Sequence, residues 1–175
     1  LVTFSAAVSE PAMGVNRHSS LTRFLRVWCI VSRIIKRLRN RQTTSEEITP
    51  GEKSVVLLRA IKQEQAAAYG AEIMQVAKGK PVSSKSELAP LYPFLDNGVL
   101  KVGGRLAFGE HLNEAMRYPI ILPKQSALST LIVRDIHVRY LHAGVQTVIS
   151  ESRHEFWIVG LRTMAKRCVR ECVTC

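Results

Sequence analysis

The residues of this chain best suited to chemistry are two histidines and two cysteines near its C-terminus. Four residues separate His137 from His142, twenty-nine residues follow, and two residues separate Cys172 from Cys175. Two histidines and two cysteines are a ligand set of closed, tetrahedral structural zinc sites. The short gap lets both sulfurs reach one metal from a single turn. The pattern therefore predicts one structural zinc ion per chain, bound by these four side chains.

Other interpretations of these residues stay open at the level of sequence. The cysteine pair can be incidental, or it can be a redox pair, although redox pairs usually begin a helix that follows a strand. Cys168 lies one helical turn before Cys172 and can compete as a ligand, and His154 is a weaker competitor. We treat Cys168 as a small buried apolar residue.

The two histidines cannot face one metal from one unbroken helix, because five residues turn about 140° around a helix axis. We therefore expect the helix that carries His137 to end near Tyr140, with His142 on the following turn. Gly144 then suits the left-handed cap that often follows a helix. So small a unit buries little apolar surface, so zinc binding should supply much of its folding free energy.

The elements that must position these ligands are expected to be mostly helices. Apolar residues recur every three or four positions over residues 20–40, which predicts a helix there. Thr49 and Glu52 have the spacing of a capping box for a helix over 52–78, which Gly70 can divide. The helices expected around the zinc ligands cover 125–140, 145–153 and 161–172, with an aromatic core at 156–157.

Strand-like sequence is confined to a short middle segment. Asp96-Asn97-Gly98 between residues 94–95 and 99–102 predicts a β-hairpin with a glycine in its turn, and 118–122 reads as a further strand. Gly103-Gly104 gives a bend and lacks the pattern of a phosphate-binding loop. The remaining segments are an expected loop over 1–19, a polar linker over 42–52 and a turn-rich break over 79–85.

The expected fold class is mainly α with a small β segment. It comprises a helical connector, a short β-hairpin unit and a three-helix unit stabilised by zinc. We divide the chain into a basic helical connector with its linker at 1–50, a helical segment at 51–88, a small β unit at 89–123 and a zinc-binding domain at 124–175.

Positive charge is concentrated in two parts of the chain, whose formal net charge is +11. Residues 11–45 contain no acid and eight basic residues: Arg17, Arg23, Arg26, Arg33, Lys36, Arg37, Arg39 and Arg41. The third zinc-unit helix adds Arg162, Lys166, Arg167 and Arg170 against Glu171. Clustered positive charge favours polyanions, since neutralised phosphates release counterions. A solvated basic face that binds nothing in particular is the alternative.

The helix over 20–40 is too charged to span a membrane, because Arg26 and Arg33 interrupt its apolar run. Two alternatives stay open: it can lie on a membrane surface as a basic amphipathic helix, or it can belong to a mitochondrial transit peptide. Four cysteines without a signal peptide favour a reducing compartment. We expect an intracellular protein of the nucleus and cytoplasm.

Two carboxylates have the separation found in enzymes that use two metal ions for phosphoryl transfer. Thirty-five residues separate Asp135 from Glu171. Two-metal catalysis needs carboxylates that converge within a few ångströms. Asp135 lies on the helix of His137 and Glu171 lies beside Cys172, so we reject a catalytic site here. No Ser-His-Asp or Cys-His arrangement is credible either.

Several motifs in order resemble the polyprotein of BEL/Pao-type LTR retrotransposons, in the zinc-binding region of the integrase. They are LYPFLDNGVLKVGGRL at 91–106, YPIILP at 118–123, His137 followed by LHAGVQT at 141–147, FWI at 156–158 and CVTC at 172–175. The resemblance is specific over 90–175. More loosely, Arg17-His-Ser-Ser20 and the basic helix after it resemble the connector between the RNase H and integrase regions, which is the interpretation we favour.

The resemblance implies a function for the predicted zinc site. His137, His142, Cys172 and Cys175 match the family's four zinc ligands. The domain would resemble a helix-turn-helix, bind the DNA ends of the element and associate with other integrase subunits. Arg162, Lys166, Arg167 and Arg170 would contact phosphates if they face outward. The family's catalytic core follows this domain and is not in this chain, so we expect a non-catalytic fragment without a small-molecule substrate. A standalone zinc-dependent protein–protein interaction module is the alternative.

Overall fold

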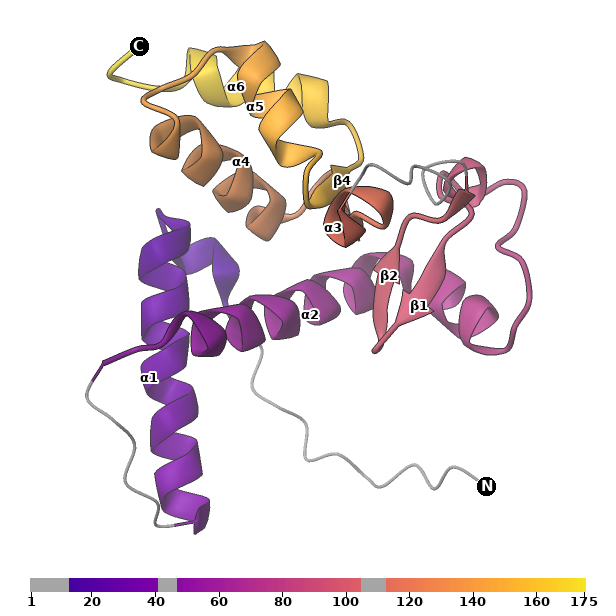
Figure 1. The fold of residues 1–175 in the computed structure, drawn as a ribbon, viewed down its shortest axis with the longest axis horizontal. Helices are drawn as coiled ribbons and strands as arrows, with labels where there is room; N and C mark the ends of the chain where they lie inside the picture. Colours follow the sequence, from indigo (N-terminus) through magenta and orange to yellow (C-terminus); the bar gives the residue numbers. More distant parts are fainter. Residues whose placement is uncertain (1–12, 41–46, 105–112) are drawn as a thin grey trace.

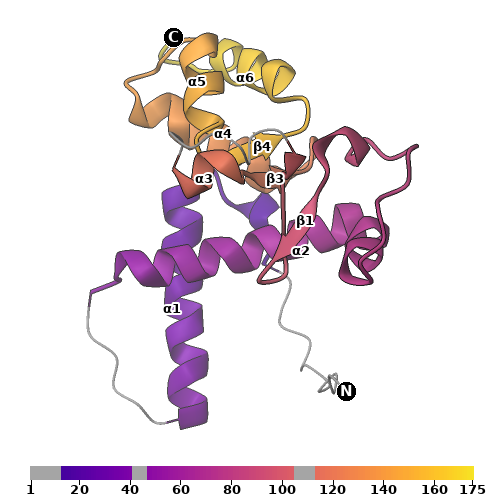
Figure 2. The same cartoon turned by 45° about the vertical axis from the view of Figure 1, so that its right-hand side comes forward.

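The computed structural model describes residues 13–40, 47–104 and 113–175. Two long helices, α1 (Leu21–Asn40) and α2 (Pro50–Ala77), cross each other, and a unit of three shorter helices lies beside the crossing (Figures 1 and 2). The shorter helices are α4 (Ala127–Arg139), α5 (Val145–Ser152) and α6 (Leu161–Arg170). The part expected as a loop over 1–12, Arg41, the linker part at 42–46, and residues 105–106 of the first motif lie outside the described residues.

A small sheet lies between α2 and the three-helix unit. In the described part of the chain, its strands run in the order β1 (Phe94–Asp96), β2 (Val99–Lys101), β3 (Ile120–Leu122) and β4 (Phe156–Ile158). The pairs β1–β2 and β2–β3 are antiparallel, and β3–β4 is parallel. Short helical turns complete the order of elements: η1 (Val15–Arg17), η2 (Ala89–Leu91) and α3 (Glu114–Arg117). The mainly helical fold class with a small β segment is confirmed.

The expected hairpin forms, but its turn is one residue shorter than expected, because Asp96 belongs to β1. Asp96 pairs with Val99, so the loop consists of Asn97 and Gly98, whose φ angles are 49° and 77°. Two consecutive positive φ angles are typical of the tight type I′ turn that Asn-Gly favours. Strand β4 differs from the expectation, because residues 156–157 were expected only as core aromatics. They form a strand because β3 offers them a paired edge, while Phe156 still buries its ring.

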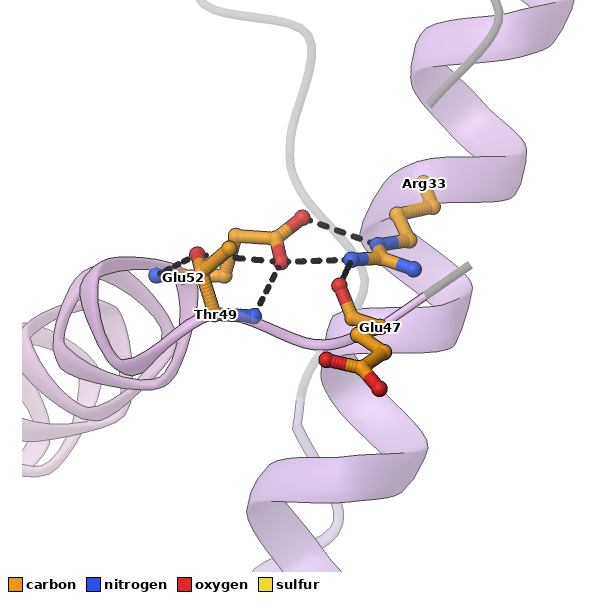
Figure 3. Close-up of polar contacts among 4 residues, drawn as sticks. All are labelled: Arg33, Glu47, Thr49 and Glu52. Carbon is orange, nitrogen blue, oxygen red and sulfur yellow. Dashed lines mark hydrogen bonds and ion pairs between the residues drawn. The ribbon is translucent and has the colours of Figure 1, made fainter. Parts of the chain in front are cut away.

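One ion pair joins α1 to the start of α2 (Figure 3). The carboxylate of Glu52 accepts hydrogen bonds from Arg33 Nε at 2.8 Å and Arg33 Nη2 at 2.7 Å. The same carboxylate accepts the backbone N–H of Thr49, while Thr49 Oγ1 accepts that of Glu52, which completes the predicted capping box. Arg33 Nη2 also donates to the carbonyl of Glu47. A residue counted in the basic cluster therefore fixes the crossing of two helices.

Helix α2 is bent near the predicted position and is bonded to the sheet before the bend. The non-helical backbone lies at Tyr69, one residue before Gly70. The side chain of Gln65 is fully buried; its Nε2 donates to the carbonyls of Leu100 (2.9 Å) and Ile121 (2.6 Å), and its Oε1 accepts the N–H of Leu100 at 2.8 Å. Strands β2 and β3 share a single residue pair. Gln65 therefore satisfies buried backbone groups that a longer ladder would pair.

The N-terminal helices and the three-helix unit share one apolar core. Phe24 of α1 and Ile61 of α2 are fully buried in the same cluster as Leu128 and Val133 of α4 and Val148 of α5. The described core residues of η1, α1 and the first half of α2 therefore pack against the zinc unit. Because β4 pairs with β3, the sheet also crosses the expected boundary after residue 123. That the four segments fold as separate units stays a prediction.

Helix α1 keeps an uncovered apolar stripe along one side. Spaced by three or four residues, its four members are Val27, Ile30, Ile34 and Leu38, between 40% and 80% exposed. The half of α1 toward Asn40 extends past α2 in both views (Figures 1 and 2). Among the described helices, none has an apolar segment long enough to cross a bilayer.

Candidate metal centre

The four predicted ligands come together at one end of the three-helix unit. His137 lies in the last turn of α4, His142 in the turn before α5, and Cys172 and Cys175 follow α6. One ligand atom from each residue lies within 4.8 Å of the others. His137 is buried, His142 and Cys172 are half-buried, and Cys175 is exposed at the rim. Residues thirty-eight positions apart thus form a single cluster with one open side.

The distances between these atoms agree with a tetrahedral zinc site. Zn–N bonds of about 2.0–2.1 Å and Zn–S bonds of about 2.3 Å place neighbouring ligand atoms roughly 3.3–3.8 Å apart in a tetrahedron. His137 Nε2 lies 3.3 Å from His142 Nδ1 and 3.6 Å from Cys175 Sγ, and His142 Nδ1 lies 3.2 Å from Cys172 Sγ. The cluster therefore forms a structural zinc site, as predicted. Four protein ligands leave no coordination position for a reacting water.

The backbone of Ala143 sets the orientation of the first ligand. His137 Nδ1 lies 2.8 Å from the carbonyl oxygen of Ala143. A carbonyl can only accept, so Nδ1 carries the proton and donates it, which leaves Nε2 deprotonated toward the cluster. Such an outer contact fixes the tautomer and the ring plane of a metal-binding histidine. Side-chain patterns carry no signal for a backbone carbonyl, so the sequence did not reveal this residue's role.

The turn between the two histidines corrects one prediction. The helix ends near Tyr140 and His142 sits on the following turn, as expected. Gly144, however, is not the left-handed cap: its φ is −66° and it caps the N-terminus of α5. The left-handed residues are Leu141 (φ 55°) and His142 (φ 60°). The chain must reverse before Gly144 because the ring of His142 has to return to His137.

The electrostatics of the cluster favour a metal-binding thiolate. Without metal, the pKa of Cys172 is lowered to about 6, first by a hydrogen bond from the His137 ring, which requires a proton on Nε2 as well, and then by the backbone N–H of Cys175. Because the thiolate is the form that binds zinc, a lowered pKa makes the ligand available near neutral pH.

The competing residues lie elsewhere in the described part of the chain. Cys168 is half-buried against the apolar core and is not a member of the four-residue cluster, and burial raises the pKa of its thiol. His154 lies 3.5 Å from Glu151. Asp135 pairs with Arg139 at 3.0 Å and Glu171 pairs with Arg167 at 2.9 Å, each along its own helix or helix end. The two carboxylates thus have separate arginine partners.

The basic residues of α6 lie on the exposed side of the helix. Leu161 and Ala165 are buried, whereas the four cations named from the sequence are exposed: Arg162, Lys166, Arg167 and Arg170. The condition that they face outward is therefore met. Part of the Arg167 guanidinium is already paired, because its Nε donates a hydrogen bond to the carboxylate of Glu171 at 2.9 Å.

Comparisons with known proteins agree with the metal centre. A family model described as the integrase zinc binding domain matches residues 124–175. The match begins just before α4 and ends on the fourth ligand, so it contains all four ligands and the α6 cations. Comparisons with curated proteins and with solved structures gave no match.

Proposed function

We propose that this chain is a non-catalytic, zinc-binding part of a retrotransposon-type integrase, which contacts DNA and other integrase subunits during DNA integration. The observation that carries the proposal is the match of residues 124–175 to the integrase zinc binding domain, together with the convergence of its four ligand side chains. A domain of this kind is a non-catalytic part of an integrase. Zinc supplies folding free energy and takes no part in a reaction.

Zinc binding would serve DNA contact by fixing the position of α6. The metal joins the end of α4 and the turn before α5 to the residues that follow α6. The core face of α6 is thereby held against α4 and α5, and its cations point to solvent. Arg162, Lys166 and Arg170 are the proposed phosphate contacts, together with Arg167, which also holds Glu171. Such contacts position a protein on DNA without reading its sequence.

Finer assignments rest on the sequence motifs alone. We propose a BEL/Pao-type element as the parent, with the residues before 124 lying between its RNase H and integrase regions. As part of the same proposal, we place the protein in the nucleus and cytoplasm. The motifs at 91–106 and 118–123 support it, because they precede the zinc ligands in the order expected of the family.

A second function is favoured by one feature of α1. The uncovered stripe of Val27, Ile30, Ile34 and Leu38 would suit an apolar contact with another protein. A standalone zinc-dependent protein–protein interaction module would use such a face. Salt separates the two functions, because DNA binding weakens steeply with salt and a mainly apolar interface does not.

The test is titration of the zinc-loaded protein into labelled duplex DNA at several salt concentrations. The double variant Arg162→Gln/Lys166→Gln should bind more weakly and lower the salt slope by about 1 per lost phosphate contact. Lys78→Gln/Lys80→Gln, at the distant end of α2, removes the same charge from exposed positions and is the matched control. The DNA proposal would be contradicted if both double variants lost the same DNA affinity. It would also be contradicted if the wild type showed no salt-dependent binding.

A further inference from the structure

A groove between α4 and α6 adjoins the basic side of α6. It has a volume of about 590 Å³, and residues from both helices line it. Three cations border it: Lys124 just before α4, Arg134 on α4 and Arg167 on α6. The lining contains one acid, Glu171, whose carboxylate is held by Arg167. The lining therefore carries a net positive charge.

Two of these cations have no acidic partner in the part of the chain that the structure describes. The ion pairs found there do not include Lys124 or Arg134, and both side chains are exposed. Surface arginines are often paired, as Arg139 is with Asp135 on the same helix. Positive charges facing a shared groove raise the local concentration of anions.

The path of Lys124 depends on a glycine at the other wall. Gly160 has a φ of 71°, and a Cβ at this position would lie 3.1–3.2 Å from the methylene carbons of Lys124. The lysine stem therefore lies across Gly160, where the chain enters α6. Lys124 thus lies at one end of the groove, while Arg167 lies farther along α6. Thr130 and Thr163 add hydroxyl groups to the lining between the two helices.

We infer that the groove between α4 and α6 binds a phosphodiester segment of nucleic acid, with Lys124 and Arg134 on one wall and Arg167 on the other. The inference rests on the proposed DNA contact and extends it to a second helix. Arg167 belongs both to the exposed face of α6 and to the groove, so one backbone can pass from that face into it. The sequence concealed this surface because Lys124 and Arg134 are isolated in a segment of low net charge.

The experiment compares three double variants of the zinc-loaded 175-residue chain on one labelled duplex DNA. They are the groove variant Lys124→Gln/Arg134→Gln, the α6 variant Arg162→Gln/Lys166→Gln and the control Lys78→Gln/Lys80→Gln. The dissociation constant is measured against salt concentration. The groove variant should reduce the salt slope by about 1 for each lost phosphate contact, and the control should leave it unchanged. Zinc content and circular dichroism establish that each variant is folded.

The outcomes separate failure of this inference from failure of the function beneath it. If the α6 variant loses salt slope while the groove variant matches the control, the inference is overturned and DNA contact stands. If the wild type shows no salt-dependent binding, both the groove inference and the proposed DNA contact are contradicted. A groove variant that changes the sedimentation coefficient of the free protein, with its salt slope intact, would assign the groove to contact between copies of the chain instead.

Discussion

Ala143 is hydrogen-bonded to His137 twice. Its N–H donates to the carbonyl of His137 at 3.2 Å, and its own carbonyl accepts the Nδ1–H of the imidazole ring at 2.8 Å. The first bond closes the turn after α4, and the second directs Nε2 toward the other ligands. One short turn therefore ends a helix, returns His142 to the cluster and selects the tautomer that binds metal.

Zinc should bind at one ion per chain and should be needed for stability. His142→Ala and Cys175→Ser should each lose the metal, because three ligands hold zinc less tightly than four. Treatment with EDTA should lower the helical circular dichroism signal and the Tm of the wild type, since metal binding supplies folding free energy. Metal content by mass spectrometry and thermal unfolding measure both effects.

The same experiment has matched controls of each ligand type. Cys168→Ser and His154→Ala change a cysteine and a histidine outside the cluster, and both variants should retain one zinc. Loss of zinc in Cys168→Ser but not in Cys175→Ser would reassign the fourth ligand. A wild type that contains no metal and has an unchanged spectrum after EDTA would refute the zinc site.

Glu52 should make stability depend on acid pH. Its pKa is lowered from 4.5 to about 2, chiefly by the hydrogen bonds from Arg33 and next by the N–H of Thr49. The unfolded chain therefore takes up the proton first as pH falls. The stabilisation is complete above pH 4.5 and is lost between about 4.5 and about 2.

The variant Glu52→Gln isolates this contribution. At pH 7 it should be less stable than the wild type by about 1–2 kcal/mol, because it loses an ion pair and weakens a capping box. The gap should narrow below pH 4.5 in urea unfolding, while any acid effect on the zinc ligands acts on both proteins. A gap that stays constant down to about pH 2 would contradict the assignment.

Removal of the Gln65 amide should weaken the joint between α2 and the sheet. Gln65→Leu keeps most of the volume but leaves the N–H of Leu100 and the carbonyls of Leu100 and Ile121 without their side-chain partner. The expected loss is about 2–4 kcal/mol in the free energy of unfolding. Gln146→Leu, at an exposed position of α5, should change it by less than about 0.5 kcal/mol. Equal stability of the two variants would show that the buried amide is dispensable.

Phe24 tests the continuity of the core between α1 and the zinc unit. Phe24→Ala should cost about 3–5 kcal/mol and should speed the transfer of zinc to a chelator, because its ring packs in the cluster that contains α4. Ile34→Ala, on the same helix but half exposed, should change either quantity little. If Phe24→Ala lowers the free energy of unfolding but leaves the rate of zinc transfer unchanged, α1 and the zinc unit are stabilised independently.

Local sequence determined most helices, the hairpin and the identity of the metal ligands, but not strand β4. The capping box at Thr49 and Glu52, the Asn97-Gly98 turn and the break after Tyr140 each depend on residues within a few positions of one another. Patterns of this kind are readable because the interacting groups recur at fixed spacings. Residue type also predicted zinc, since thiolate and imidazole ligands define the metal that they prefer.

Only the tertiary structure decided what lies beside these elements. The pairing of β4 with β3, the bonds of Gln65 to two strands and the use of Arg33 to hold Glu52 join residues distant in sequence. The tertiary structure also decided that His142, and not Gly144, has a left-handed backbone. Closing the metal cluster overrides the local preference for glycine at such a position. Such contacts depend on which surfaces meet in space, and residue spacing along the chain does not encode that meeting.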